Sequence, residues 1–377
     1  MQKTEKVYCK DVKNWLIKHQ PIEPKGHALK RLTVLACLIS ALTKSERASL
    51  KSIGEQMEDN IDLESRIKKA KRWLNNKWTD TESHFIPYIK PIIRTFLKQK
   101  KLVLAIDGST MGNGCMCLML SIIWRNRAIP ICWIVRKAPK GHFPEQMHLD
   151  VLEMSKKLFD SVGSSIGITS KDCEITLLGD GEFDGNQLQQ ACLDAGWSYV
   201  LKTAKNTLIA DNPEMDGASQ MKAMLPEFNM NHLYFPNMYV TKQGFGTVNI
   251  VYWHDKKYQK PLYLLTNLDN APQAEKLYRK RYIIETLFAD LKSRGFNMEW
   301  TKISNPLTIF NLLIVACLAY ILAILFEFDA RKSPLLGRFC RKDRVNDLSV
   351  FQLGLRAILF FIKQQTCISF QFSKNFP

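Results

Sequence analysis

Three closely spaced apolar segments restrict the fold of this 377-residue chain more than any other feature. We expect them to form strands at residues 102–108, 115–124 and 128–135. Only Arg125-Asn126-Arg127 separates the last two, and strands joined by such short turns pair as antiparallel neighbours. The segment therefore predicts an antiparallel meander.

Helix and strand patterns alternate after this meander. A helix pattern at 144–158 precedes a strand that ends at Asp180, and a helix pattern at 184–195 precedes a strand at 196–202. Strands that alternate with helices in this way form mixed sheets with helices on their faces. We therefore predict an α/β fold.

The segments around this core differ from it in pattern. Helical periodicity dominates the start of the chain, and Pro87 and Pro91 mark the approach to the core. Alternating apolar segments with turn residues between them follow the last core strand. The predicted divisions are a helical DNA-binding domain (1–98), a core (99–204 and 273–328), a β-rich insertion (205–272) and a basic C-terminal helical segment (329–377).

Residues 53–74 show helical periodicity, and Arg66, Lys69 and Arg72 fall close to one face of this predicted helix. Short helices with a basic last member are typical of a helix-turn-helix-like grip on DNA. A domain that packs against the rest of the protein and exposes a basic helix face to solvent has the same sequence pattern. Both interpretations stay open, and the three residues are candidate DNA contacts.

An almost uninterrupted apolar run covers residues 306–328 and could span a bilayer by length alone. It is a single run, includes Asn311, and lies within an otherwise soluble pattern. A helix buried against a large sheet is also apolar on all sides. We favour the buried helix and expect no membrane partner.

The chain carries a formal net charge of +17, which is unevenly distributed. Residues 1–100 hold 21 Lys and Arg against 11 Asp and Glu, and residues 286–377 hold 12 against 6, whereas the centre is nearly neutral. Basic flanks of this size favour a nucleic acid or an anionic surface as partner over simple solubility charge. The ten cysteines show no zinc spacing and the N-terminus no signal-peptide pattern, so we expect a cytoplasmic, nucleoid-associated protein.

Residues 278–292 form a predicted helix whose spacing groups four polar side chains. At about 100° per residue, Tyr278, Arg281, Glu285 and Lys292 fall on one narrow stripe. Such a stripe is either an ordinary ladder of salt bridges or part of a site for metal and phosphate.

Two carboxylates upstream favour the site. Asp107 and Asp180 each end a predicted buried strand and are followed by Gly. Neighbouring strands and one helix can bring Asp107, Asp180 and Glu285 to one place, where divalent cations would relieve their repulsion. Oxygen ligands without soft ligands suit Mg²⁺ or Mn²⁺, and two such ions can catalyse phosphodiester chemistry.

These residues carry a family resemblance over about residues 28–330. The spacing Y-x2-R-x3-E-x6-K of Tyr278, Arg281, Glu285 and Lys292 resembles the YREK signature of bacterial insertion-sequence transposases of the DDE class. The contexts Leu104-Ala-Ile-Asp107-Gly-Ser and Leu178-Gly-Asp180-Gly-Glu-Phe-Asp-Gly185 resemble those of that group's two aspartates.

The resemblance implies an RNase H-like core with a β insertion before the Glu285 helix. It implies that Asp107, Asp180 and Glu285 are the catalytic triad and hold two Mg²⁺ or Mn²⁺ ions. It assigns Tyr278, Arg281 and Lys292 to phosphates of the transposon end, as positioning contacts. The implied partners are double-stranded DNA, namely terminal inverted repeats and target DNA, and a second copy of the chain in a homodimeric synaptic complex.

Some features of the family are less well matched. Gly181-Glu182 follows Asp180 where many relatives carry Arg, so a phosphate contact is missing there. Base-trapping aromatic residues of the family could correspond to Trp197, Trp253 or Trp300, each of which could equally be a packing residue. Gly141-His142 resembles a polar loop near the family site.

We therefore expect a transposase that cleaves transposon ends and transfers strands into target DNA. A stand-alone DNA nuclease with the same triad is the alternative within enzymes. A host-adopted DNA-binding derivative without catalysis is the alternative of another class, although the intact triad argues against it.

Overall fold

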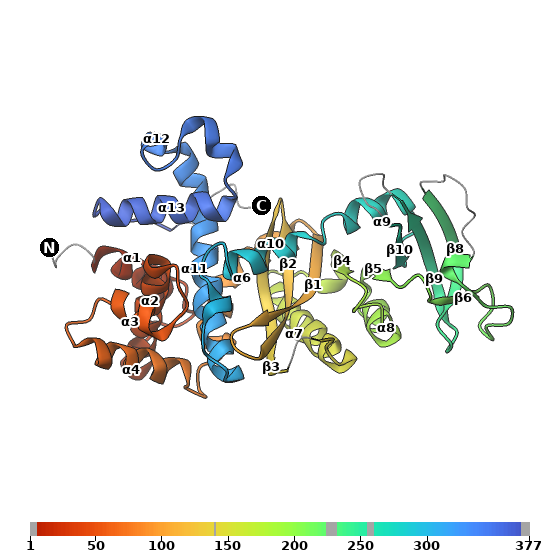
Figure 1. Ribbon diagram of the computed structural model, residues 1–377, viewed down its shortest axis with the longest axis horizontal. Helices are drawn as coiled ribbons and strands as arrows, with labels where there is room; N and C mark the ends of the chain where they lie inside the picture. Colours follow the sequence, from red (N-terminus) through yellow and green to blue (C-terminus); the bar gives the residue numbers. More distant parts are fainter. Residues whose placement is uncertain (1–5, 139–140, 224–231, 255–259, 371–377) are drawn as a thin grey trace.

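The computed structural model describes residues 6–138, 141–223, 232–254 and 260–370. The molecule is elongated, with helices from both ends of the chain on one side and the strands β8 and β9 on the other (Figure 1). The helices are α1 (Lys6–Lys18), α2 (Gly26–Ser45), α3 (Leu50–Gln56), α4 (Leu63–Leu74), α5 (Thr81–His84), α6 (Ile86–Lys98), α7 (Glu145–Ser164), α8 (Asn186–Asp194), α9 (Ala271–Tyr278), α10 (Ile283–Leu291), α11 (Pro306–Lys332), α12 (Leu336–Phe339) and α13 (Val350–Lys363).

One mixed sheet of ten strands runs through the molecule in the order β3-β2-β1-β4-β5-β10-β9-β8-β6-β7. The strands are β1 (Lys101–Met111), β2 (Cys115–Trp124), β3 (Arg127–Lys137), β4 (Glu174–Gly179), β5 (Ser198–Thr203), β6 (Leu208–Ala210), β7 (Ser219–Gln220), β8 (His232–Val240), β9 (Phe245–Trp253) and β10 (Leu262–Thr266).

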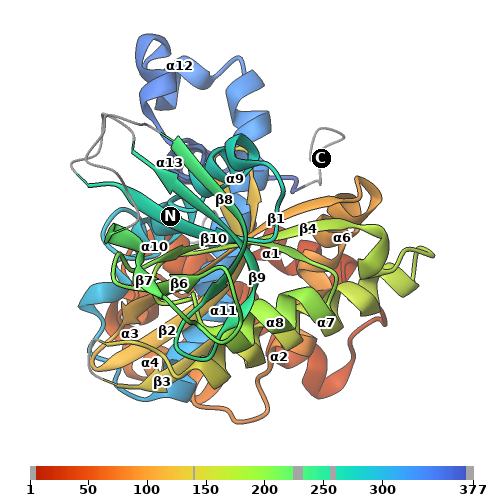
Figure 2. The same cartoon turned by 90° about the vertical axis from the view of Figure 1, so that its right-hand side faces the viewer.

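The strand pairing confirms the predicted α/β fold with an RNase H-like core. Strands β1, β2 and β3 form the antiparallel meander, and β4 and β5 continue the sheet parallel to β1. Helices α7 and α8 lie on one side of the sheet, and α9 and α10 lie on the other (Figure 2). The β-rich segment before the Glu285 helix is also present, but β10 pairs with β5, so its strands extend the core sheet.

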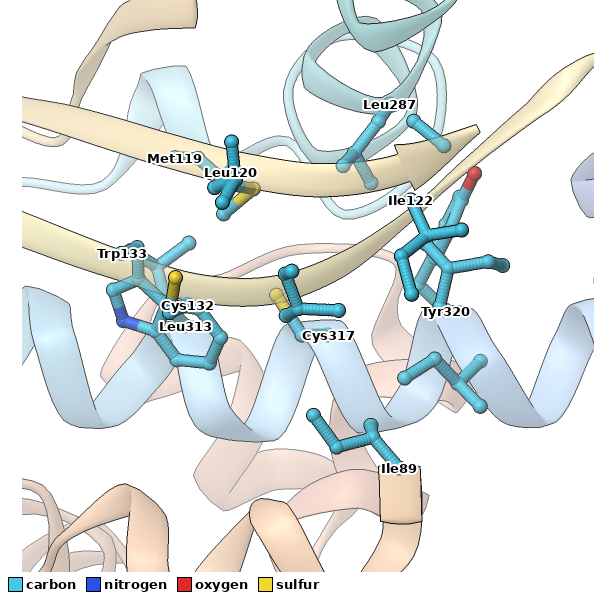
Figure 3. Close-up of a cluster of buried hydrophobic side chains, with 14 of the residues drawn as sticks. Ile89, Met119, Leu120, Ile122, Cys132, Trp133, Leu287, Leu313, Cys317 and Tyr320 are labelled. Carbon is cyan, nitrogen blue, oxygen red and sulfur yellow. The ribbon is translucent and has the colours of Figure 1, made fainter. Parts of the chain in front are cut away.

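The apolar run at 306–328 forms α11, which packs against α2, α13 and β3. By length and composition α11 could cross a membrane, but 94% of its most apolar window is buried inside the protein. Leu313, Cys317 and Tyr320 of α11 lie beneath the strands that carry Trp133 and Ile122 (Figure 3). The helix therefore forms the centre of the core.

Asn311 explains the polar position within this apolar helix. Its Nδ2 donates to the carbonyl oxygens of Leu74, at 2.8 Å, and of Asn76, at 3.2 Å. Leu74 is the last residue of α4 and Asn76 follows it closely, so two main-chain carbonyls at the end of α4 accept from a buried side chain of α11. Asn311 thereby ties the N-terminal helices to the core.

One detail of the N-terminal prediction is wrong. The periodic stretch 53–74 is two helices, because α3 ends at Gln56 and α4 begins after Asp62, whose carboxylate caps it by accepting from the Ser65 N–H. Pro87 and Pro91 lie within α6, the helix that directly precedes β1, and Pro87 is in its first turn.

Most of the cysteines are buried thiols. All ten are free, and eight of them are buried. Cys9 is partly exposed and Cys367 is exposed.

Candidate active site

The register between two parallel strands brings Asp107 and Asp180 together. The pairing of β1 with β4 runs from Lys101↔Glu174 to Ala105↔Leu178, so two residues further along each strand Asp107 comes level with Asp180. Adjacent strands lie about 4.8 Å apart. Asp107 and Asp180 therefore lie side by side at the carboxyl end of β4, close enough for the charge of Asp180 to act on Asp107.

The prediction that Asp107 ends its strand is wrong. Strand β1 continues to Met111, and Asp107 stays paired with Met119 of β2. The pairing of β1 with β4 ends at Ala105, two residues before Asp107, which leaves this side of β1 without a paired strand at Asp107. Gly108 also matters, because a Cβ there would lie 2.5 Å from the Phe143 ring that packs on this part of β1.

The predicted continuous helix 278–292 is also wrong. Helix α9 ends at Tyr278 and α10 begins at Ile283. Where the two helices meet, the N–H groups of Lys280, Arg281 and Ile283 each donate to the carbonyl three residues earlier, so the chain forms tightened turns. Lys292 lies just beyond α10, as its C-terminal cap.

Arg281 lies between two of the predicted catalytic carboxylates. Its guanidinium Nη1 is 3.9 Å from Asp107 Oδ2, and its Nη2 donates to Glu285 Oε1. The guanidinium also lies 6.0 Å from the centre of the Tyr278 ring. Tyr278, Arg281 and Glu285 therefore meet beside Asp107 although they do not share one helix.

Lys292 lies further along β1 on the same part of the molecule. Its Nζ donates to Ser109 Oγ at 2.6 Å and to Thr110 Oγ1 at 3.3 Å. Asp107 and Ser109 are two residues apart in a strand and so point to the same face of the sheet. An ammonium and a guanidinium therefore flank the carboxylates on this face.

The surroundings of Asp107 favour its protonated form. Burial and the charge of Asp180 raise the pKa of Asp107 to about 7, and Glu285 adds to this shift. The Arg281 charge and the Gly108 N–H, which donates to Asp107 Oδ1 at 2.7 Å, oppose it. A strained group of carboxylates of this kind is typical of functional sites.

This raised pKa predicts a pH-dependent stability without metal. Between about pH 4 and about pH 7 the unfolded chain releases the Asp107 proton while the folded chain keeps it, so the free energy of unfolding falls as pH rises, by at most about 1.4 kcal/mol per pH unit. Urea unfolding in the presence of a chelator at several pH values measures this slope. Asp107→Asn should flatten the slope, and an unchanged slope in that variant would contradict the assignment.

The donor set fits divalent cations. Asp107, Asp180 and Glu285 supply only carboxylate oxygens, the ligands that Mg²⁺ and Mn²⁺ prefer. The mutual repulsion seen in the pKa of Asp107 is the kind that such a cation relieves. Within the described parts of the chain, no three Asp, Glu, His or Cys side chains already lie close enough to hold a metal, and Arg281 occupies the space between Asp107 and Glu285.

Sequence reasoning missed the surroundings of Glu182. This carboxylate accepts from the Phe143 N–H and lies 3.6 Å from His142 and 3.8 Å from the buried His148. Burial raises the pKa of Glu182, but His148 and the Phe143 N–H outweigh it, so the net shift is downward. Glu182 thus anchors the loop of His142 beside Asp180, which its position two residues after Asp180 could have suggested.

The three tryptophans differ sharply in exposure. Trp197 is 1% and Trp253 is 2% exposed, and the Arg279 guanidinium lies 4.2 Å from the centre of the Trp253 ring. Trp300 is 76% exposed, on a tight turn that begins at Met298. Only Trp300 among these three presents its ring to a ligand without rearrangement.

The predicted N-terminal DNA contacts adjoin a large groove of about 1190 Å³ between α2 and α4. Lys69 and Arg72 line it together with Lys30, Arg31 and the exposed Trp78. Lys69 is paired with Asp59 at 2.8 Å. Arg66 does not line the groove, and its Nη1 donates to the Met57 carbonyl at 2.8 Å.

A family model described as the transposase DDE domain matches residues 98–322, which include all three candidate catalytic carboxylates. None of the curated proteins matches the chain.

Two solved structures of Argonaute from Marinitoga piezophila, one with 5′ OH guide RNA and target DNA and one with guide RNA alone, show a distant likeness. Identities are 16% and 14%, with TM-scores of 0.24 and 0.25. The matches cover 69% and 68% of this chain but only 35% and 34% of the Argonaute chains. TM-scores this low do not establish a shared overall structure.

Proposed function

Because the chain belongs to the family of DDE transposases, we propose that it cleaves the ends of a mobile DNA element and joins the freed strand to target DNA. The observation that carries the proposal is the β1–β4 register, which brings Asp107 level with Asp180 where Glu285 and Arg281 approach. Its substrates are terminal inverted repeats and a target duplex, and a homodimer holds two ends together. The protein acts in the cytoplasm at the nucleoid.

In this proposal Asp107, Asp180 and Glu285 would hold Mg²⁺ or Mn²⁺, which would polarise the phosphodiester and lower the pKa of the attacking water or hydroxyl. The chain's own cations position the substrate. Arg281 can bind a phosphate through two nitrogens, and Lys292 acts as a single point charge. The phenol of Tyr278, whose pKa burial raises to about 12, stays protonated and can donate to a phosphate oxygen.

The reaction comprises two phosphoryl transfers. In the first, water attacks phosphorus at the element end, the bond from phosphorus to the 3′ oxygen breaks, and that oxygen takes up a proton. In the second, the oxygen of the freed 3′-OH attacks a phosphodiester of the target and bonds to its phosphorus. The bond from that phosphorus to the target strand's own 3′ oxygen breaks, and the released oxygen takes up the proton of the hydroxyl. No net oxidation occurs in either step.

A joining assay tests the proposal against a stand-alone nuclease. A labelled duplex from the inverted repeats that flank the gene is incubated with a supercoiled plasmid, the wild-type protein and Mg²⁺. A transposase yields labelled plasmid, whereas a nuclease yields only cut duplex. Absence of both products, or unchanged products in excess chelator, would contradict the metal-dependent transposase.

We further propose that the groove between α2 and α4 binds the DNA backbone. Lys30 and Arg72 are exposed cations on its rim. Replacing either by Ala should lower affinity at every sequence and reduce the slope of log affinity against log salt by about 1. Fluorescence anisotropy of a labelled duplex at several salt concentrations measures both effects.

Lys157→Ala is the matched control, because this exposed lysine lies on α7 away from the groove. It should leave affinity and salt slope unchanged. An equal loss in the control and groove variants would mean that the protein binds through its general charge alone. Arg66→Ala should act chiefly on stability, since Arg66 is bonded to the Met57 carbonyl.

A further inference from the structure

Two cysteines of the N-terminal helices lie in direct contact. Cys9 of α1 and Cys37 of α2 are 28 residues apart in sequence, yet the Cys9 Sγ donates to the Cys37 Sγ at 3.4 Å. Both are free thiols. A disulfide joins its sulfur atoms at about 2.0 Å, so a small rotation of the two side chains brings them within bonding distance.

The fold holds the two helices that carry these thiols in place. Helix α1 packs on α2, and its Trp15 ring stacks on Tyr88 of α6 at 5.3 Å between ring centres. The Asp11 carboxylate accepts from the Ile368 N–H at 2.7 Å, which ties α1 to the C-terminal segment as well. Contacts on several sides of α1 therefore keep Cys9 beside Cys37.

The surroundings of the pair favour a thiolate at Cys37. The hydrogen bond from Cys9 lowers the pKa of Cys37, and the charges of Lys69 and Lys13 lower it further, whereas burial and Asp59 oppose the shift. The same hydrogen bond and burial raise the pKa of Cys9. Because the thiolate is the nucleophilic form of cysteine, Cys37 is the sulfur that attacks an oxidant and Cys9 is the thiol that reacts next.

The pair is accessible from the side of α1. Cys9 is partly exposed, and Cys37 behind it is 8% exposed. Cys117 and Cys317, by contrast, are both 0% exposed in the core. A small oxidant can therefore reach the two contacting sulfur atoms, whereas these core thiols are shielded from it.

We propose that Cys9 and Cys37 form a peroxide-sensitive modification site, at which oxidation converts the two thiols into a reversible disulfide between α1 and α2. Disulfides in reducing compartments are usually transient and redox-sensing. The site lies outside the catalytic residues, and the proposal does not rest on the transposase reaction.

Hydrogen peroxide supplies the oxidising equivalents. The Cys37 thiolate attacks one peroxide oxygen, an S–O bond forms, the O–O bond breaks, and the released hydroxide takes up a proton to become water. The Cys9 sulfur then attacks the Cys37 sulfur, the S–S bond forms, and the S–O bond breaks with loss of a second water that carries the Cys9 proton. The two sulfur atoms together lose two electrons, and the peroxide gains two.

The disulfide would act on the helices that form the basic groove. Cys37 lies seven residues after Lys30, so both fall on the same side of α2, and Lys30 lines the groove between α2 and α4. A bond that closes the segment from Cys9 to Cys37 restricts the unfolded chain. Oxidation should therefore make the N-terminal helices more resistant to unfolding.

Mapping of disulfides in the full-length protein tests the proposal. Reduced wild type is treated with hydrogen peroxide, the remaining thiols are alkylated in denaturant, and the peptides are identified by mass spectrometry. We expect one peptide pair linked through Cys9 and Cys37, and its disappearance after dithiothreitol. The oxidised protein should unfold at a temperature about 2–6 °C higher than the reduced protein.

Cys9→Ser should lose both the disulfide and the thermal shift, and dimedone should then trap its Cys37 as sulfenic acid. Cys367→Ser is the control, because it removes an exposed cysteine outside the pair and should keep the disulfide and the shift. Recovery of Cys9 and Cys37 as alkylated thiols, after a peroxide dose that oxidises Cys367, overturns the proposal. A disulfide from either residue to Cys367 or to a second copy overturns it as well. The mapping is made on wild type, so its outcome does not depend on how well the variants fold.

Discussion

Replacing Asp107 or Asp180 by Asn, or Glu285 by Gln, should reduce cleavage of the element end by about 10³-fold or more. Each amide removes one negative charge from the group that the β1–β4 register and Arg281 bring together. Loss of a single preorganised electrostatic contact already costs about 10²- to 10³-fold, and residues that act as one unit lose nearly all activity singly. Single-turnover cleavage of a labelled end in Mg²⁺ measures the loss.

Two comparisons separate chemistry from folding in this experiment. Asp194→Asn changes an exposed carboxylate at the end of α8 and should cut like wild type. Asp107→Asn should be at least as stable as wild type above about pH 7, since it removes a buried charge. Binding of Mn²⁺, followed by electron paramagnetic resonance, should weaken in all three triad variants. If any one of these variants cleaves as fast as wild type, the residue that it replaces is not a member of the catalytic triad.

Replacing Trp133 by Ala should lower the free energy of unfolding more than replacing it by Phe or replacing Trp300 by Ala. The Trp133 side chain is fully buried and its ring meets Phe85 at 4.7 Å and Phe310 at 5.7 Å between centroids. Phe85 precedes α6, Trp133 lies on β3 and Phe310 on α11, so the ring joins the N-terminal helices, sheet and core helix. Trp133→Ala should lower the free energy of unfolding by about 3–5 kcal/mol.

Chemical unfolding followed by circular dichroism measures this loss. Trp133→Phe keeps an aromatic ring in the contact and should lose less. The Trp300 side chain is largely exposed, so Trp300→Ala should change the free energy of unfolding by no more than about 0.5 kcal/mol. A Trp133→Ala protein as stable as wild type would mean that the three layers do not depend on this contact.

The sequence predicted the helices and strands well where the local residue pattern and the packing of the folded chain favour the same structure. The apolar runs at 115–124 and 128–135 became β2 and β3 because short turns leave them one way to pair. The run at 306–328 became a buried helix, whose Asn311 bonds to main-chain carbonyls near α4. In both cases periodicity and burial point to the same structure.

The site was less accessible to sequence reasoning, because its geometry depends on contacts between distant segments. The open side of β1 at Asp107 arises where β4 ends, which no pattern around Asp107 records. The break after Tyr278 arises because α9 packs on β5 and β9, whereas α10 packs on β1, β2 and β3. One straight helix would not reach both surfaces. The residues between Tyr278 and Ile283 include no Pro or Gly, so the sequence gives no local signal for the bend.

The continuity of the sheet makes the molecule stiff along its length. Hydrogen bonds run without interruption from β8 and β9 through β10 to β5, and from β5 to β4, the strand that ends beside Asp180. The outer strands are therefore tied to the catalytic strands through backbone hydrogen bonds and not through a flexible linker. A displacement of β9 would shift β10 and β5 with it, and through them β4, which ends beside Asp180.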